Sequence, residues 1–437
     1  MSTSRFLKLG VGFYLYSVGT ALLVQFLVLP HLLRELHDGN GLLVQTDSTV
    51  FHKIGAELAA TNPTALSIWG KNPKKDHFPE LVGILYKLTT PKPWVVIPVS
   101  ALLHAGAALV LILLLMPFAH SSWAIRGALP FLLFPSALGW YAQIHRDGLF
   151  CFGFFLFIYG WLVLYQEKYF RGILAAWTGA FVAWLGRGYF VEIVLNLVPL
   201  ALVALGGWLA VRAYKERRKP AASLLIAPWL LYFLLLPLGK SNLGSDVEPL
   251  TKRGTGTIDI EDRWRPSPWL PSVIDGRLKY VAYRRDSFRN LSQDAGSRID
   301  TTTRLTSAAE VFGYIPRALQ ISFFSPFPKA WFERGLRPDS WITRPLVGIE
   351  MLVVYFSILL LIASLPRLWP RPDFWSLPIP NVSLLILCGM TINIVGNLYR
   401  IRYAFIMCLV GLGFSQLGYL WEKLRRFAPL KQVTSNP

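Results

Sequence analysis

The chain is poor in cysteine and lacks several common catalytic motifs. Its three cysteines, Cys151, Cys388 and Cys408, all fall inside apolar segments of the 437-residue sequence. This placement excludes a secreted disulfide framework and a Cys-x-x-Cys metal clip, so we expect buried thiols that act as small hydrophobic side chains. The H-E-x-x-H, P-loop and G-x-S-x-G motifs are absent. The sequence therefore contains no motif that indicates a metalloprotease, an ATPase or a serine hydrolase.

Acidic residues are few compared with basic ones. The sequence has 25 Asp and Glu against 44 Lys and Arg, which gives a formal net charge of +19. The basic residues are scattered between apolar blocks and do not form one stripe. This pattern argues against nucleic acid as a partner, and it favours membrane topology and anionic phosphate groups as the reasons for the charge.

Long apolar blocks dominate the sequence, with 53% hydrophobic residues and a mean hydropathy of +0.43. About ten stretches approach or reach the ~17–25 residues that cross a bilayer. They are residues 7–30, 94–119, 124–142, 149–165, 172–186, 189–211, 221–238, 346–365, 381–399 and 403–421. The first lacks a small-residue cleavage pattern, so we expect a retained span rather than a signal peptide. The predicted fold class is an all-α polytopic membrane protein.

Basic clusters predict the orientation of these spans. Clusters at residues 166–171, 212–220, 366–372 and 422–427 all fall on the same side as the N-terminus. The positive-inside rule makes that side cytoplasmic, with both termini on it. The opposite, extracytoplasmic side then receives the remaining polar segments, which are residues 31–93, 143–148, 187–188, 239–345 and 399–402.

Three regions follow from this topology. Residues 1–238 form an N-terminal transmembrane module whose first outward loop is 31–93. Residues 239–345 form an extracytoplasmic cap, whose hydrophobic content is thin for an independent core. Residues 346–437 supply the last transmembrane helices and a cytoplasmic tail.

Two helices are predicted within the cap. Apolar residues recur at helical spacing over 278–291 and again over 311–323, and both segments are typical of amphipathic helices that lie on a membrane. Ser307 and Glu310 form a capping-box pattern ahead of the second helix. The prolines of SPFP, residues 325–328, should end it.

The first outward loop carries an acid and an imidazole close to the membrane. In TDSTVFHKIGAEL, residues 46–58, the apolar residues repeat every three or four positions and predict a short helix. Asp47 lies at its start and is either the N-cap or a group directed into a cleft. His52 follows one and a half turns later and is a candidate substrate-binding residue.

A second group of polar residues falls on the same predicted side. The turn QIHRDG, residues 143–148, holds an acid and two cationic side chains, which is more than a tight turn requires. Arginines next to later spans either snorkel to headgroups or bind phosphate. The candidates are Asp147 as a catalytic acid, with His145, Arg146, Arg187, Arg400 and Arg402 as substrate-binding residues.

Two acids fall near the starts of apolar spans. They are Glu192 and Glu350. An ionisable residue within a span is a candidate functional residue, although both could instead lie at the interface.

These features together resemble the GT-C superfamily of membrane glycosyltransferases, distantly the protein mannosyltransferases and aminoarabinose transferases. Asp47 in QTDSTVFH matches the first-loop acid, Asp147 in HRDG the second-loop acid, and Arg400 or Arg402 in YRIRYAF the late basic motif. The resemblance implies an enzyme of the bacterial inner membrane. Its donor would be a polyprenyl-phosphate-linked sugar, its acceptor a cell-envelope glycan, glycolipid or protein, and its catalytic base the first-loop acid.

The sequence departs from this family in two places. Asp47 lacks the adjacent Glu of the protein mannosyltransferases, and the second loop reads HRD instead of a paired-acid pattern. One acid and one imidazole make a poorer site for a hard cation than two or three carboxylates. No cofactor is therefore predicted with certainty, and a divalent metal is not favoured.

Two other functions stay open. An O-antigen polymerase or ligase also joins polyprenyl-linked glycans with outward arginines, but it does not need the early acid. A transporter or lipid flippase would place ionisable groups near the middle of the bilayer, whereas the polar groups here gather at one surface.

Overall fold

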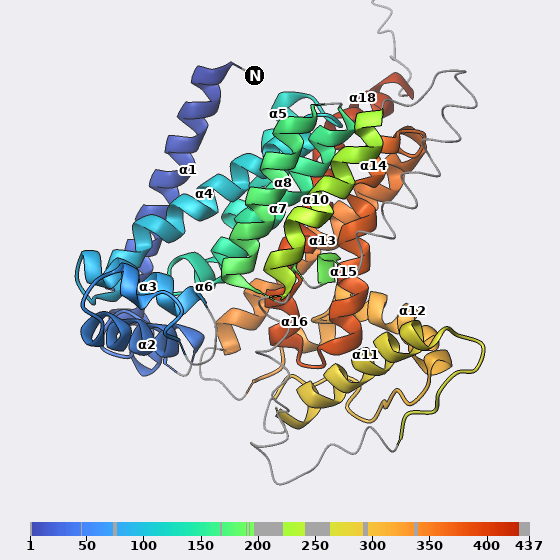
Figure 1. The fold of residues 1–437 in the computed structure, drawn as a ribbon. Helices are drawn as coiled ribbons and strands as arrows, with labels where there is room; N and C mark the ends of the chain where they lie inside the picture. The colour runs from blue at the N-terminus through green and yellow to red at the C-terminus, as the bar shows by residue number, and fades with distance from the viewer. Residues whose placement is uncertain are drawn as a thin grey trace, which may run out of the picture.

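A computed structural model describes residues 2–44, 46–72, 77–166, 168–188, 190–191, 193–195, 222–240, 263–291, 296–335 and 340–427. The regular elements over these ranges are helices, with no β-strand (Figure 1). The all-α prediction is confirmed.

Six helices among the described residues are long and apolar enough to cross a membrane. They are Thr3–Leu32, Pro93–Leu115, Asp147–Leu164, Ser340–Leu368, Asp373–Thr391 and Tyr403–Arg425. The chain therefore has the character of an integral membrane protein. The predicted count of ten is not reached, partly because stretch 189–211 lies almost entirely outside the described residues.

Stretch 124–142 shows why some predicted spans are lost. It divides into α5 (Ser121–Leu133) and α6 (Pro135–Tyr141), each too short to cross a bilayer. Phe134 between them has an extended backbone, the conformation that a following proline favours. Stretches 172–186 and 221–238 do form helices, α8 (Tyr169–Gly186) and α10 (Ala222–Lys240), although neither is among the six.

The N-terminal helices pack through small residues. Helix α1 (Thr3–Leu23) continues into the π-helical η1 (Val24–Leu32) and lies against α4 (Ile97–Leu115). Helix α7 (Asp147–Tyr165) packs against α4 and, more extensively, against α8. A Cβ on Gly160 or Gly179 would collide with the backbone of the facing helix, so glycine allows α7 and α8 their close approach.

The C-terminal helices are interrupted where the cap meets them. Helix α13 (Ser340–Leu368) is followed by α15 (Pro378–Thr391), which ends eight residues before the predicted boundary at 399. The extended segment after it pairs with the cap, since Ile299 N donates to Asn393 O at 2.9 Å and Val395 N to Ser297 O at 2.8 Å. The chain then forms α16 (Val395–Ile401), α17 (Tyr403–Ser415) and α18 (Leu417–Phe427).

Two pairs of helices lie outside this bundle. The first loop forms α2 (Asp47–Thr61) and α3 (His77–Leu88), and the cap forms α11 (Ser272–Leu291) and α12 (Ala308–Phe324). Both cap helices were predicted, as was the end of α12 before SPFP. Short helical elements complete the fold, at Arg34–Leu36, Leu66–Ile68, Pro93–Val96, Pro328–Trp331 and Pro372–Trp375.

One half of the predicted capping box is present at the start of α12. Ser307, the N-cap, accepts with Oγ from Glu310 N at 3.4 Å, which satisfies a donor that the first turn of a helix leaves without an intrahelical partner. The Glu310 carboxylate accepts from Thr306 N at 2.6 Å, one residue before the N-cap, and not from Ser307 N as the prediction implied.

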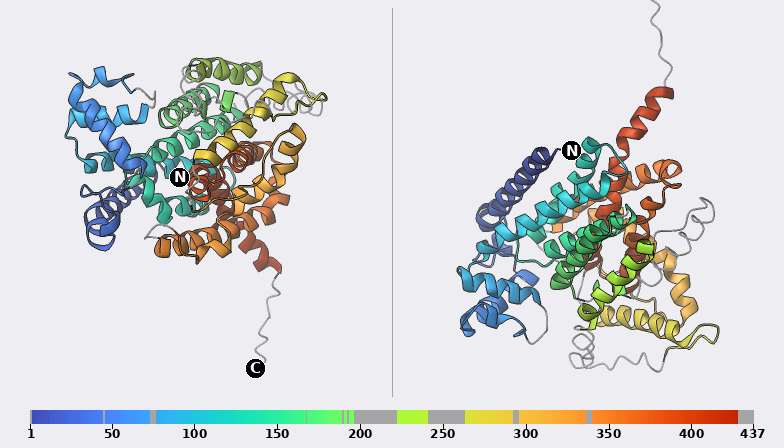
Figure 2. Two further views of the ribbon diagram at one scale, coloured as in Figure 1. Left: turned by 90° about the horizontal axis from the view of Figure 1, so that it is seen from below. Right: turned by 45° about the horizontal axis from the view of Figure 1, so that its top comes forward.

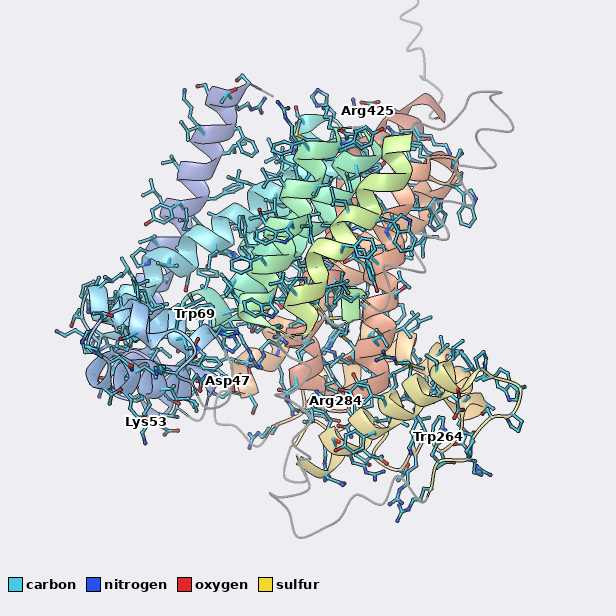
Figure 3. All side chains as sticks on the ribbon, viewed as in Figure 1. Asp47, Lys53, Trp69, Trp264, Arg284 and Arg425 are labelled. Carbon is cyan, nitrogen blue, oxygen red and sulfur yellow. The ribbon has the colours of Figure 1, made fainter. Side chains whose placement is uncertain are left out.

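The first loop and the cap lie at the same end of the bundle. The N-terminus and Arg425 lie at the opposite end, with Asp47 on the side of the loop and cap (Figures 1 and 3). Seen from below, the first-loop helices and the cap helices occupy different sides of that end (Figure 2). The fold thus gathers the predicted outward loops at one end of the membrane helices.

Candidate functional site

Asp47 is the first residue of α2 and does not cap it. The N-cap is Thr46, whose side chain makes no capping bond. The Asp47 carboxylate instead pairs with Arg400, with 2.8 Å between Oδ2 and Nη1. The structure therefore joins the first loop to a residue from the far end of the sequence.

The HRD turn supplies the interior of the same site. Asp147 is the first residue of α7, and its carboxylate is hydrogen-bonded to Arg187 at the end of α8. His145 Nδ1 lies 2.5 Å from Asp147 Oδ2. Arg146 places its guanidinium carbon 5.7 Å from the centre of the Phe51 ring on α2, so the turn also contacts the first-loop helix.

Arg400, on α16, connects these groups. Its Nη1 lies 3.0 Å from His145 Nε2, and its Nε lies 3.7 Å from Asp147 Oδ2. His145 Nε2 is also 3.7 Å from Asp47 Oδ2. We call Asp47, His145, Asp147, Arg187 and Arg400 the polar cluster. Four separate parts of the fold build it: the start of α2, the turn before α7, the end of α8, and α16.

Exposure changes steeply across the polar cluster. The Asp47 side chain is 42% exposed and that of Arg400 23%, whereas His145, Asp147 and Arg187 are 4%, 5% and 2% exposed. Asp47 and Arg400 therefore form the accessible rim. A ligand from outside would meet this carboxylate and this guanidinium first.

Several buried atoms of the cluster are not satisfied. Of the atoms that the structure describes there, His145 Nδ1, Asp147 Oδ2 and Arg400 Nε have no partner with hydrogen-bond geometry, despite the short distances between their groups. Native proteins satisfy most buried polar atoms, so this concentration marks the cluster as a candidate functional site.

Electrostatics keep the rim acid ionised. Partial burial by itself would raise the pKa of the Asp47 carboxyl, but the positive charge of Arg400, together with that of Arg146, holds it below its usual value. Asp47 is then a carboxylate at neutral pH. It is a weak base while Arg400 is paired with it, and it becomes a stronger one when that guanidinium moves away.

Two predicted binding residues lie elsewhere. Arg402 is only two positions after Arg400, yet its guanidinium is buried at the end of α12, where it donates to the carbonyls of Ser322 and Ser325. There it satisfies carbonyls that the last turn of a helix leaves unpaired. His52 is on α2, and its Nδ1 lies 2.8 Å from the Tyr86 hydroxyl of α3, a contact within the first loop. The structure therefore does not bring either residue into the polar cluster.

Glu350 contacts the polar cluster indirectly, through the residue that precedes Arg400. It is buried on α13, where its carboxylate accepts from Ser136 N at 2.7 Å and from the Tyr399 hydroxyl. Tyr399 directly precedes Arg400, so this contact orients α16. The sequence indicated an acid within a span, but it gave no signal for Tyr399 beyond its adjacency to Arg400. Glu192 lies outside the described residues.

No group of three or more His, Cys, Asp and Glu side chains within the described ranges is arranged to hold a metal ion. The two carboxylates of the cluster are instead each paired with a guanidinium.

No protein-family model and no curated protein matches this chain. The geometry of the polar cluster is therefore the basis on which a function can be proposed.

Proposed function

We propose that the chain is an integral membrane glycosyltransferase that moves a sugar from a polyprenyl-phosphate donor to a cell-envelope glycan, glycolipid or protein. The observation that carries the proposal is the Asp47–Arg400 pair at the rim of a buried charged cluster. In this proposal the architecture is GT-C-like, with about ten spans in a bacterial inner membrane. The cluster faces the extracytoplasmic side and both termini are cytoplasmic.

Asp47 is the proposed catalytic base. An acceptor hydroxyl must lose its proton as it attacks the anomeric carbon, and a positioned carboxylate contributes about 10²–10⁴-fold as a general base. Asp47 fits this role because it is ionised and is the most exposed member of the cluster. Asp147 is too buried to meet an acceptor directly.

The arginines are proposed to bind the phosphate of the donor. The leaving phosphate gains negative charge as the glycosidic bond breaks, so fixed guanidinium groups stabilise the transition state more than the ground state. Arg400 reaches the rim, while Arg187 is fixed beneath it by Asp147. If the phosphate replaced Asp47 as the partner of Arg400, the guanidinium would bind the phosphate. The Asp47 carboxylate, no longer paired with a cation, would at the same time become a stronger base.

The alternatives explain the cluster less well. An O-antigen polymerase or ligase needs the arginines but not the early acid, whereas here Asp47 shares Arg400 with His145. A transporter would use charges deep in the bilayer. The cluster instead lies where the starts of α2 and α7 meet the end of α16, at the loop end of the bundle.

The test is mass spectrometry of cell-surface glycans and lipid-linked sugars from the native host. Wild type is compared with a deletion, with Asp47→Asn, and with Glu57→Gln, which alters an exposed acid on the same helix. We expect the deletion and Asp47→Asn to lose one sugar mass per repeat or glycolipid, and Glu57→Gln to resemble wild type. Loss of whole polymers in the deletion, with normal glycans in Asp47→Asn, would support the polymerase or ligase instead.

A further inference from the structure

His145 is held by charged groups at both ring nitrogens. Nδ1 lies 2.5 Å from Asp147 Oδ2, while Nε2 lies 3.0 Å from Arg400 Nη1 and 3.7 Å from Asp47 Oδ2. The ring itself is almost fully buried, with Phe51 and Trp140 edge-on to it at centroid distances of 6.3 Å and 6.4 Å. A packing histidine would not require three charged neighbours from three parts of the fold.

These contacts select one tautomer of the ring. A guanidinium can only donate, so a hydrogen bond from Arg400 requires a lone pair on Nε2. The proton of the neutral ring then lies on Nδ1, beside the Asp147 carboxylate. Asp147 is in turn fixed by Arg187. The Nε2 lone pair of His145 therefore points toward the rim, where it accepts from Arg400 beside Asp47.

We propose that His145 is a second proton acceptor of the reaction, with Asp147 as its positioning residue. The inference rests on the proposed function, because it requires a phosphate to take Arg400 away. When Arg400 turns to that phosphate, His145 Nε2 loses its donor and faces Asp47 Oδ2 directly. The two atoms are already 3.7 Å apart, so a small rotation of either side chain brings them within hydrogen-bond distance.

The proton can be followed through each step. Asp47 takes it from the acceptor hydroxyl as the new glycosidic bond forms and the sugar–phosphate bond breaks. It then passes from Asp47 to His145 Nε2, which leaves a carboxylate on either side of an imidazolium. The leaving polyprenyl phosphate, or water, accepts it afterwards, and the neutral ring returns to its starting tautomer. No oxidant, reductant or further reactant is needed.

The charges around His145 support this sequence. The charged groups that contact it are Asp47 from α2, Asp147 from its own turn and Arg400 from α16. Arg187 from α8 pairs with Asp147, and Arg146 acts on Asp47. Arg400 occupies the Nε2 lone pair with its hydrogen bond, and Arg187 fixes the Asp147 carboxylate beside Nδ1. Removing the guanidinium from Nε2 therefore frees this lone pair at the stage when a proton must be stored.

The experiment is solid-state NMR of the full chain in lipid nanodiscs, with ¹⁵N,¹³C-labelled histidine and undecaprenyl phosphate as the probe. The sequence has seven histidines, and the spectrum of His145→Gln identifies the His145 signals. Without the probe we expect the neutral ring to carry its proton on Nδ1. With it, the ¹⁵N signal of Nε2 should shift as the hydrogen bond from Arg400 is lost and the Asp47 carboxylate becomes the neighbour of Nε2. Asp47→Asn should shift differently, because its side chain carries no carboxylate.

Controls distinguish a failure of the proposed role of His145 from a failure of the proposed function. The ³¹P signal of the same samples reports whether the phosphate binds. Binding with a proton on Nε2 in the free protein, or with an unchanged Nε2 signal, would overturn the role of His145 and leave the proposed function standing. Absence of binding would remove the donor site, and both proposals with it. His52→Gln, whose imidazole contacts Tyr86, should lose a different signal and keep the response.

Discussion

Replacing Asp47 with Asn should tighten phosphate binding while abolishing sugar transfer. The Asp47 carboxylate occupies the place on Arg400 that the donor phosphate would need, with 2.8 Å between Oδ2 and Nη1. A phosphate must therefore break this ion pair before it binds. Because the two side chains are 42% and 23% exposed, the pair is partly screened, and exposed pairs of this kind contribute about 0.2–1 kcal/mol.

That range converts to a modest but measurable effect. With tenfold in affinity per ~1.4 kcal/mol, loss of the competing pair should tighten the dissociation constant about 1.4- to 5-fold. The assay is titration of undecaprenyl phosphate into purified wild-type, Asp47→Asn and Glu57→Gln protein in nanodiscs. The advantage of Asp47→Asn should shrink as salt is added, since screening weakens the pair in wild type.

Weaker binding by Asp47→Asn would refute this reasoning. It would mean that the carboxylate orients Arg400 for the phosphate and does not compete with it. An equal change in Glu57→Gln would point to net charge and not to the ion pair. Tighter binding with retained transfer would remove Asp47 from the role of base.

Three further predictions concern residues around the cluster. Tyr399→Phe removes one of the donors to buried Glu350 and should cost about 1–3 kcal/mol, seen as a lower temperature of thermal unfolding. Arg402→Met should lower thermal stability, because carbonyls at the end of α12 lose their donor, while the affinity for undecaprenyl phosphate stays within twofold or so of wild type. The pKa of Asp300 is lowered, chiefly by hydrogen bonds from Arg317, so its stabilising effect is present at neutral pH and is lost as the pH falls through that lowered pKa. Asp300→Asn should therefore unfold at a lower temperature than wild type at pH ~7, with the difference closing toward pH ~3.

The membrane character and the helices of the cap could be predicted because they depend on local patterns. Apolar runs and the pairing of Ser307 with Glu310 need no knowledge of distant contacts, and the cap of Ser307 on Glu310 N formed as expected. The interruption at residues 392–394 could not be predicted, because the apolar run continues through it. Its extended backbone is stabilised by pairing with cap residues about a hundred positions earlier.

The site was predictable in part for the same reason. Outward polarity placed Asp47, His145, Asp147 and Arg400 on one side of the membrane, and the structure brings these four side chains together. It could not separate Arg400 from Arg402, because both precede the same apolar helix. Helix α16 ends at Ile401, between them, and the two guanidinium groups reach different partners.

The wide spacing of the cluster along the chain bears on how the protein is made. His145 and Arg400 are 255 positions apart, whereas Arg187 follows Asp147 by only 40. During synthesis from the N-terminus, the buried Asp147 can therefore pair with Arg187 early. Asp47 and His145 can contact Arg400 only after nearly the whole chain has been synthesised. A ribosome-bound chain that stops before α16 would already contain the acid–arginine pair of α7 and α8. It would still lack the guanidinium that connects this pair to the rim, so the site is assembled only when the last helices have entered the membrane.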